Sequence, residues 1–267
     1  MAREEHFVPQ LYLSSFIDPL SKGLKDPYFW VVDLDLRLIK RRAPKNTAKL
    51  SGYYDFENGK SLEDHFAKIE NRVKKPLRQL VDGEFQLTDE DRFYLAAYLG
   101  LQLTRVPTYR QAAEGAEYKL ARKNICKILK NNDKGIEIMP PDNFRDYLIG
   151  ISAQAAIEFW SPLFFSGHWM LIIPPDTVDF FTSDNPVALL TPYSKPVIDK
   201  QLQIWFPLSP RCGLLIHFQD SHGGLVEHVE ADVATGFNNG VLAVARRYIF
   251  CSSSGQGNWA LENRLKK

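Results

Sequence analysis

Apolar residues recur at helical spacing along the N-terminal and middle parts of the chain. In residues 61–81, Leu62, Phe66 and Ile69 lie on one helical face behind a possible Ser61 cap, although Pro76 predicts a kink. Thr88 is a good N-cap residue with three acidic residues behind it, and the following residues 93–103 are apolar nearly all round, which predicts a buried central helix. The helices expected on this basis are 61–81, 88–103, 108–130, 142–159 and 231–246.

After residue 167 the pattern changes to short apolar runs separated by Pro, Gly and Asp, which is typical of β-strands. An aromatic and β-branched run at 28–36, with a hairpin partner at 37–42, predicts a strand pair near the N-terminus. The later strands are expected at 168–173, 180–182, 203–208, 212–218, 225–229 and 247–251.

This segregation of helices and strands predicts an α+β fold rather than a doubly wound sheet. A central helical segment should pack with a mostly antiparallel C-terminal sheet, which the N-terminal strand pair joins. No Pro/Gly/Ser linker separates the two halves, so we expect one composite domain over residues 1–251. Residues 252–267 begin with Ser and Gly and are expected to form a flexible C-terminal tail.

The N-terminal stretch 6–17 is unusually apolar for a chain end. Its spacing favours a short helix, with Pro9 tolerated in the first turn. We therefore expect this stretch to be held inside the fold as a plug between the central helix and the sheet. His6, at its start, is either a hydrogen-bonded core residue or an acid/base group.

Composition excludes several classes of protein. The 267 residues include 33 Lys and Arg against 32 Asp and Glu, so no global field attracts nucleic acid or anionic membrane. Three distant cysteines fit neither a disulfide framework nor a Cys-rich zinc site, and they favour a reduced, cytoplasmic setting. No apolar run approaches the roughly 18 residues that a membrane-spanning helix needs, and no secretory signal is expected.

The familiar catalytic motifs are absent from the sequence. There is no Walker A loop, dinucleotide-binding glycine motif, nucleophile elbow or His-Glu-x-x-His. His217, His222 and His228 are loosely spaced on a turn-rich segment, so we interpret them as solvated loop residues and predict no metal site.

The segment Thr182-Ser183-Asp184-Asn185-Pro186 places polar groups at the end of a predicted strand. Loops at strand ends commonly carry functional sites, which makes Asp184 and Asn185 candidates. The alternative is structural, because Asp and Asn before Pro are ordinary turn residues that bond their own backbone.

Two arginines flank the expected break at Pro107. Arg105 and Arg110 can clamp a phosphate or carboxylate bidentately, with Gln102 one turn before them. The alternative, which we favour for this pair, is that an arginine at a helix end pairs with a carboxylate or caps carbonyls.

Several motifs together resemble one known family. They are His6-Phe7-Val8-Pro9-Gln10, Trp30-Val31-Val32-Asp33, Gln102-x-x-Arg105-x-Pro107-x-x-Arg110, Thr182-Ser183-Asp184-Asn185-Pro186-Val187 and Pro207-Leu208-Ser209-Pro210. In this order they resemble the bacterial and fungal family catalogued as domain of unknown function 4238. The resemblance implies a single domain over the whole chain and marks His6, Gln10, Arg105, Asp184 and Asn185 as motif positions, without assigning them roles.

Our leading hypothesis is a nuclease-like hydrolase that cleaves a nucleotide or phosphodiester. His6 and Asp184 would be its catalytic residues, and no metal ligand is assigned. The substrate-binding residues would be Gln10, Gln102, Arg105, Arg110 and Asn185.

The alternative is a non-catalytic ligand-sensing or protein-interaction module, in a toxin or phage-defence setting. Its ligand would be a small molecule, a nucleotide or a nucleic acid, and the sequence indicates neither a cofactor nor a membrane. The charged helix 108–130 would be the surface for a protein partner. Nucleic-acid binding there is the weakest hypothesis, because acidic residues interleave with its lysines and arginines.

Overall fold

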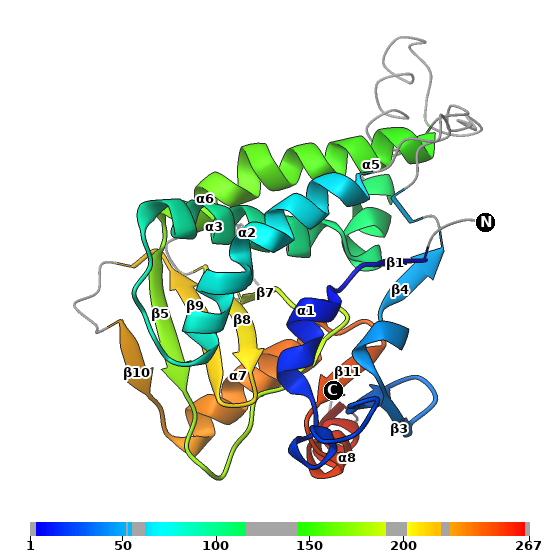
Figure 1. The fold of residues 1–267 in the computed structure, drawn as a ribbon, viewed down its shortest axis with the longest axis vertical. Helices are drawn as coiled ribbons and strands as arrows, with labels where there is room; N and C mark the ends of the chain where they lie inside the picture. Colours follow the sequence, from blue (N-terminus) through cyan, green and yellow to red (C-terminus); the bar gives the residue numbers. More distant parts are fainter. Residues whose placement is uncertain are drawn as a thin grey trace, which may run out of the picture.

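The computed structural model describes residues 4–51, 53–54, 62–115, 144–190, 202–219 and 225–264 (Figure 1). The helices are α1 (Gln10–Leu13), α2 (Glu63–Val81), α3 (Asp89–Thr104), α5 (Phe144–Ala155), α6 (Ser161–Ser166), α7 (Ala231–Val244) and α8 (Ser254–Arg264). Residues 107–115 are also helical, and Ala156–Trp160 form a π-helical turn, η4. Short 3-10 turns are η1 (Ser14–Phe16), η2 (Pro19–Ser21) and η3 (Pro44–Asn46).

The strands form three sheets among the described residues. The larger sheet has the order β10 (Val226–His228), β5 (His168–Ile173), β9 (Cys212–His217), β8 (Gln203–Ser209), β7 (Ala188–Leu190). The second has the order β3 (Leu38–Arg42), β2 (Phe29–Asp33), β11 (Tyr248–Cys251), β6 (Thr182–Ser183). A two-stranded ribbon pairs β1 (Glu4–His6) with β4 (Lys49–Ser51). Of the pairings, only β10 with β5 is parallel.

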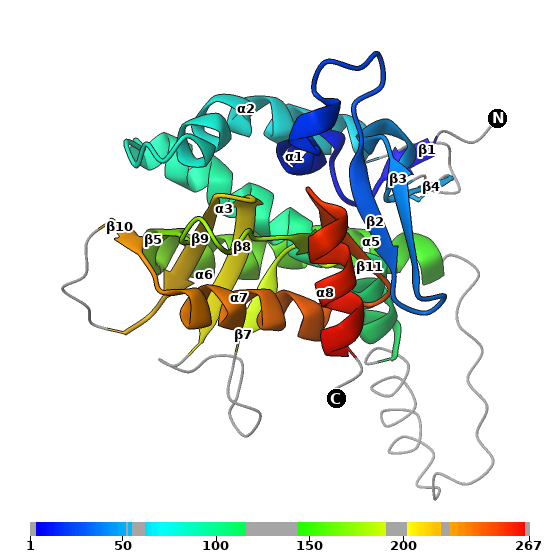
Figure 2. The ribbon, with the colours of Figure 1, turned by 90° about the horizontal axis from the view of Figure 1, so that it is seen from below.

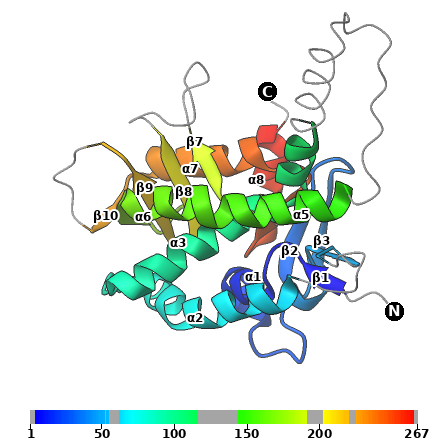
Figure 3. The same ribbon diagram turned by 90° about the horizontal axis from the view of Figure 1, so that it is seen from above.

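Side chains alternate between two apolar cores along the strands of both large sheets. In β8, Ile204 and Phe206 belong to the core under α2, α3 and α6, whereas Trp205 between them belongs to the core with α7. The second sheet behaves in the same way: Val31 faces the first core, and Val32 faces the second core with α8. Helices therefore cover both faces of the strand layer, as Figures 2 and 3 show from two sides.

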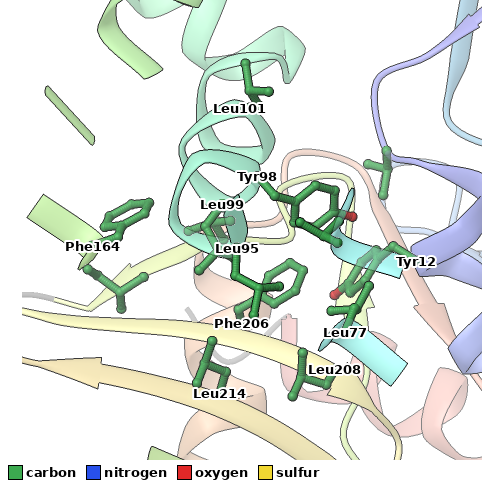
Figure 4. Packing of buried hydrophobic residues seen from close by; sticks show 14 of the residues in the cluster. Tyr12, Leu77, Leu95, Tyr98, Leu99, Leu101, Phe164, Phe206, Leu208 and Leu214 are labelled. Atoms are coloured by element: carbon green, nitrogen blue, oxygen red, sulfur yellow. The ribbon is translucent and has the colours of Figure 1, made fainter. Parts of the chain in front are cut away.

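The N-terminal stretch is buried, as the plug interpretation expected. Tyr12, on α1, stacks on Phe206 of β8 with ring centroids 4.7 Å apart, and Tyr98 of α3 packs edge-on against the same ring (Figure 4). The Tyr12 hydroxyl donates to the Pro207 carbonyl at 2.6 Å and shares a 2.7 Å hydrogen bond with the Thr182 hydroxyl. One buried tyrosine thus joins the N-terminus to both large sheets.

The central helix α3 begins where the sequence places it. The Thr88 side chain accepts from the Asp91 amide, and the Asp91 carboxylate accepts from the Thr88 amide, so the two residues form a capping box. Gly100 lets the π-helical turn η4 approach, because a Cβ at this position would lie 2.6 Å from the Ala156 carbonyl oxygen. The helix is consequently buried along most of its length.

The α+β fold with a mostly antiparallel sheet is confirmed, and two local expectations are wrong. His6 lies in strand β1 rather than at a helix start, because β1 pairs with the distant strand β4. Residues 254–264 form helix α8 on the second sheet rather than a flexible tail. The N-terminal strand pair joins the late strand β11, as the sequence predicted. The part of the expected helix 108–130 after residue 115 lies outside the described residues, as does His222.

Candidate functional site: a cationic cavity on the second sheet

A cavity of about 740 Å³ lies on one face of the second sheet. Strand register places Val31 opposite Lys40 on one side and opposite Phe250 on the other, so these side chains share one face. The same argument places Arg42 and Tyr248 on this face. All of these residues line the cavity, so the sheet face is its floor. Helix α8 covers the opposite face, where Gly257 lies close to Val32 and Ile39.

Segments from distant parts of the chain form the walls. Phe7 and residues 46–50, from the η3 turn and β4, form one wall together with Tyr53. The start of helix 107–115 contributes Thr108 and Arg110 to another wall. The described cavity is therefore enclosed by the N-terminal segment, the hairpin region and the chain just after α3, and its size is within the range of small-molecule sites.

Cationic side chains outnumber acidic ones around this cavity. The six cations are Lys40, Arg42, Lys49, Arg110, Arg246 and Arg247, and the four acids are Asp33, Asp35, Glu114 and Asp184.

Much of the acidic charge is already neutralised inside the fold. Asp33 forms a bidentate pair with Arg247, with Nη2 2.8 Å from Oδ2, and this guanidinium lowers the pKa of the Asp33 carboxyl. Lys49 pairs with Glu4. Within the described residues, no carboxylate lies within ion-pair distance of Lys40, Arg42 or Arg246. These three cations are available to a ligand.

Arg110 and Tyr53 form the inner corner of the cavity. The Arg110 guanidinium carbon lies 3.7 Å from the centre of the Tyr53 ring, and Nη1 donates to the Tyr53 carbonyl at 3.0 Å. The Tyr53 side chain is only 9% exposed, yet its hydroxyl has no hydrogen-bond partner in the described part of the chain. A buried hydroxyl without a partner is costly in a folded protein, so a ligand atom is its natural acceptor or donor.

Arg105, a predicted ligand clamp, instead holds the N-terminal segment. Its Nε donates to the Phe7 carbonyl and its Nη2 to the His6 carbonyl, both at 2.9 Å, and its Nη1 pairs with Glu70 at 2.8 Å. The side chain is 4% exposed and does not line the cavity. Arg105 therefore has a structural role. This is the alternative that the sequence analysis favoured, in which the arginine pairs with a carboxylate and binds carbonyl groups.

Asp184 also uses its carboxylate to hold backbone. Oδ1 accepts from the Arg246 amide at 2.9 Å, and Oδ2 accepts from the amides of Arg247 at 2.9 Å and Tyr248 at 3.1 Å. Burial raises the pKa of Asp184, and these three amide donors oppose that effect. The carboxylate thereby fixes the segment that carries Arg246 and Arg247 at the cavity rim.

His6 and Gln10 lie outside the lining of the cavity. The His6 ring is half-buried, and burial lowers its pKa. Its Nε2 atom has no partner among the described residues. Gln10 is exposed on α1.

Gln102 and Asn185 are buried structural neighbours of the site. Asn185 donates from Nδ2 to the Val244 carbonyl at 2.6 Å and to the Thr108 hydroxyl at 3.2 Å, which fixes the start of helix 107–115. Gln102 is fully buried on α3, and its amide group has no partner among the described residues. Of the seven predicted site residues, only Asp184 and Arg110 line the cavity.

Sequence reasoning missed Lys40, Arg42, Tyr53 and Arg246. The signal was present in Leu38-Ile39-Lys40-Arg41-Arg42, where Lys40 and Arg42 alternate with Ile39 and Arg41 and so share one face. Only the pairing with β2 and β11 shows that this face meets Phe250 rather than solvent.

The described residues contain no group of three or more His, Cys, Asp or Glu side chains that could hold a metal ion. Cys212 and Cys251 are buried free thiols, and burial raises the pKa of each to about 12. Within the same residues, no helix is long and apolar enough to cross a membrane.

The geometry defines the class of protein: an α+β domain with a cationic cavity beside its buried N-terminal segment. The chain belongs to the family described as protein of unknown function (DUF4238), whose sequence model matches residues 4–255. No curated protein and no solved structure matches it. Three residues of the motifs quoted above, Arg105, Asp184 and Asn185, hold backbone segments near the cavity through hydrogen bonds.

Proposed function

We propose that this protein is a ligand-sensing module that binds a phosphate-bearing small molecule, such as a nucleotide, in the cavity on the second sheet. The observation that carries the proposal is the set of Lys40, Arg42 and Arg246, three cations without a carboxylate partner in the described structure, around an apolar floor. Cations without partners in a concave site favour anionic ligands, and phosphate is the anion that Lys and Arg bind most often in such sites.

The floor supports a ligand larger than a free anion. Val31, which is 8% exposed, and the half-buried ring of Tyr248 offer apolar contact, and Phe250 is fully buried beside Val31. Apolar lining with a few converging polar groups is the usual composition of a small-molecule site. An organic phosphate therefore fits this cavity better than inorganic phosphate does.

Isothermal titration with AMP, ADP and the 5′-phosphorylated dinucleotide pApA tests this proposal. At low salt we expect at least one of these ligands to bind, and the double substitution Lys40→Gln with Arg42→Gln to weaken its affinity at least about tenfold, because two charged contacts are lost. Raising the salt concentration should weaken binding to the parent protein, since exposed charges are screened.

The matched control is Arg41→Gln, on the same strand but on the opposite face, where its guanidinium lies over Trp30 and Tyr28. This variant should bind like the parent. The proposal fails if none of the three ligands binds, or if Arg41→Gln weakens binding as much as the double substitution does.

A hydrolase that uses His6 and Asp184 stays a prediction that the geometry does not favour. The Asp184 carboxylate is occupied by three backbone amides, and His6 does not line the cavity. A phosphodiester cleavage assay with pApA on the parent protein and on His6→Gln distinguishes it from simple binding. Turnover that is lost in the variant would favour the hydrolase.

We further propose a cytoplasmic setting and a partner surface on the helix after α3. A cytoplasmic setting agrees with the two buried free thiols. The first turns of the helix proposed as a partner surface, residues 107–115, form a wall of the cavity through Thr108 and Arg110.

A further inference from the structure

We infer that the cavity has two anion subsites at opposite ends of its floor, and that the Tyr53 hydroxyl is a ligand-binding group in one of them. The ligand class would be a nucleotide with two separated phosphates, such as a dinucleotide. The inference rests on the proposed function and names the substrate class of the same site.

The first subsite is formed by Lys40 and Arg42 on β3. Arg42 is paired with Phe29, at the start of β2, and Lys40 is paired with Val31. The two side chains share the cavity face because they are two residues apart on one strand. Both are exposed, so a phosphate can reach them without displacing other groups.

The second subsite lies at the other end of β2, near Arg246. Tyr248 is paired with Asp33, four residues along β2 from Phe29, which corresponds to about 13 Å along the strand direction. Arg246 precedes Tyr248 and is exposed at the rim, where Asp184 fixes its backbone. Arg246 and Arg42 are therefore separated along the floor, with Lys40 between them opposite Val31.

The Tyr53 hydroxyl belongs to the second subsite. Tyr53 lines the cavity, and its hydroxyl is buried and has no partner among the described residues. The cations that act on it electrostatically are Arg110, Arg105 and Arg246, and each of them lowers its pKa against the raising effect of burial. Neither Lys40 nor Arg42 is among these cations. A hydroxyl in such positive surroundings is suited to donate to an anionic oxygen.

The side chains between the two subsites are largely apolar, which favours a nucleoside as the part of the ligand that connects its two phosphates. Val31 and Phe250 are buried in the middle of the floor, and the half-buried Tyr248 lies two residues before Phe250 on the same strand. A cavity of about 740 Å³ holds more than a mononucleotide needs, which is consistent with a ligand that spans both subsites.

The test compares pApA, which carries two phosphates, with AMP, which carries one. We expect pApA to bind the parent protein at least about tenfold more tightly than AMP, because the second phosphate adds charge-assisted hydrogen bonds. Tyr53→Phe should weaken pApA binding about tenfold, although it removes a single oxygen atom. The control Tyr28→Phe, at a ring outside the cavity lining, should leave the affinity unchanged.

Thermal unfolding distinguishes a ligand contact from a structural one. Since the Tyr53 hydroxyl has no partner in the described structure, Tyr53→Phe should leave the melting temperature of the ligand-free protein unchanged or raise it. A lowered melting temperature would show that the hydroxyl stabilises the fold, and it would overturn the role assigned here.

The outcomes separate this inference from the proposed function. If AMP and pApA bind equally and Tyr53→Phe binds pApA like the parent, the two-subsite inference fails while a phosphate-binding cavity remains. If none of AMP, ADP and pApA binds, the proposed function itself fails. Weakening by Tyr53→Phe together with weakening by the Lys40 and Arg42 substitutions supports both subsites.

Discussion

Two sets of polar residues surround the same cavity and differ in what they touch. Arg105 and Asp184 are buried, and their side chains are satisfied by backbone groups and, for Arg105, by Glu70. Lys40, Arg42 and the Tyr53 hydroxyl have no such partners in the described structure. Residues of the first set hold the walls, and residues of the second set are available to a ligand. Charged residues in distinctive motifs can therefore hold backbone in place, while the residues that we propose to bind a ligand are less distinctive in sequence.

Comparison of the two sets of polar residues predicts that substitution of Arg105 causes the largest loss of stability. Arg105→Ala should lower the free energy of unfolding by about 3–5 kcal/mol, because Glu70 and the carbonyls of His6 and Phe7 lose a buried charged partner. Denaturant unfolding followed by circular dichroism measures this change. The control Arg72→Ala removes an exposed guanidinium 5.5 Å from the Tyr94 ring and should cost about 1 kcal/mol or less. Similar losses at both positions would contradict the structural role of Arg105.

Asp184 should show the next largest effect. Asp184→Ala leaves the amides of Arg246, Arg247 and Tyr248 without their acceptor, and we expect a loss of about 1–3 kcal/mol in unfolding free energy. Asp176→Ala, which removes an exposed partner of Arg211, should cost less than about 1 kcal/mol in the same assay.

The same substitution sharpens the distinction between structure and catalysis. A catalytic Asp184 would give a variant that unfolds like the parent and loses turnover. A positioning Asp184 gives a less stable variant with weaker ligand binding, because the segment that carries Arg246 is no longer fixed. Unchanged stability with lost turnover would contradict the positioning role.

Local patterns in the sequence predicted most elements of the fold. Apolar periodicity identified α2 and α3, and alternation together with turn residues located β5, β8 and β9. The sequence did not predict helix α8, because its Ser and Gly residues are typical of loops. Its stability comes from tertiary packing: Gly257 allows close approach to the second sheet, and Trp259 lies 5.8 Å from the Phe181 ring.

The cavity could not be predicted in the same way, because its parts meet only through long-range pairing. Tyr53 reaches Arg110 across the whole of α2 and α3, and β3 reaches Phe250 through β2. Lys40 and Arg42 look like an ordinary solvated hairpin in sequence. Arg105 and Asp184 drew attention as charged residues in motifs, but most of their partners are backbone atoms, which no sequence pattern specifies.

We expect the smallest effect on stability at His6, which belongs only partly to each of the two sets of polar residues. Its carbonyl accepts from Arg105, while its ring is half-buried with an Nε2 atom that has no partner in the described structure. Burial lowers its pKa below the ordinary value of 6.5, so between those two values the unfolded chain binds more protons than the folded protein. Stability from this group is therefore present above about pH 6.5 and falls as the pH decreases.

His6→Gln should consequently reduce the loss of unfolding free energy between pH 7.5 and pH 5.5, as two denaturant titrations on each protein would measure. The control His65→Gln changes an exposed ring on α2 and should keep the pH dependence of the parent. If His6→Gln keeps it as well, the ring does not resist protonation in the fold, and the backbone carbonyl would be the part of His6 that the fold uses. If the dependence is reduced while pApA binding stays intact, His6 is a half-buried neutral residue outside the cavity, and the ligand chemistry is assigned to Lys40, Arg42 and Tyr53.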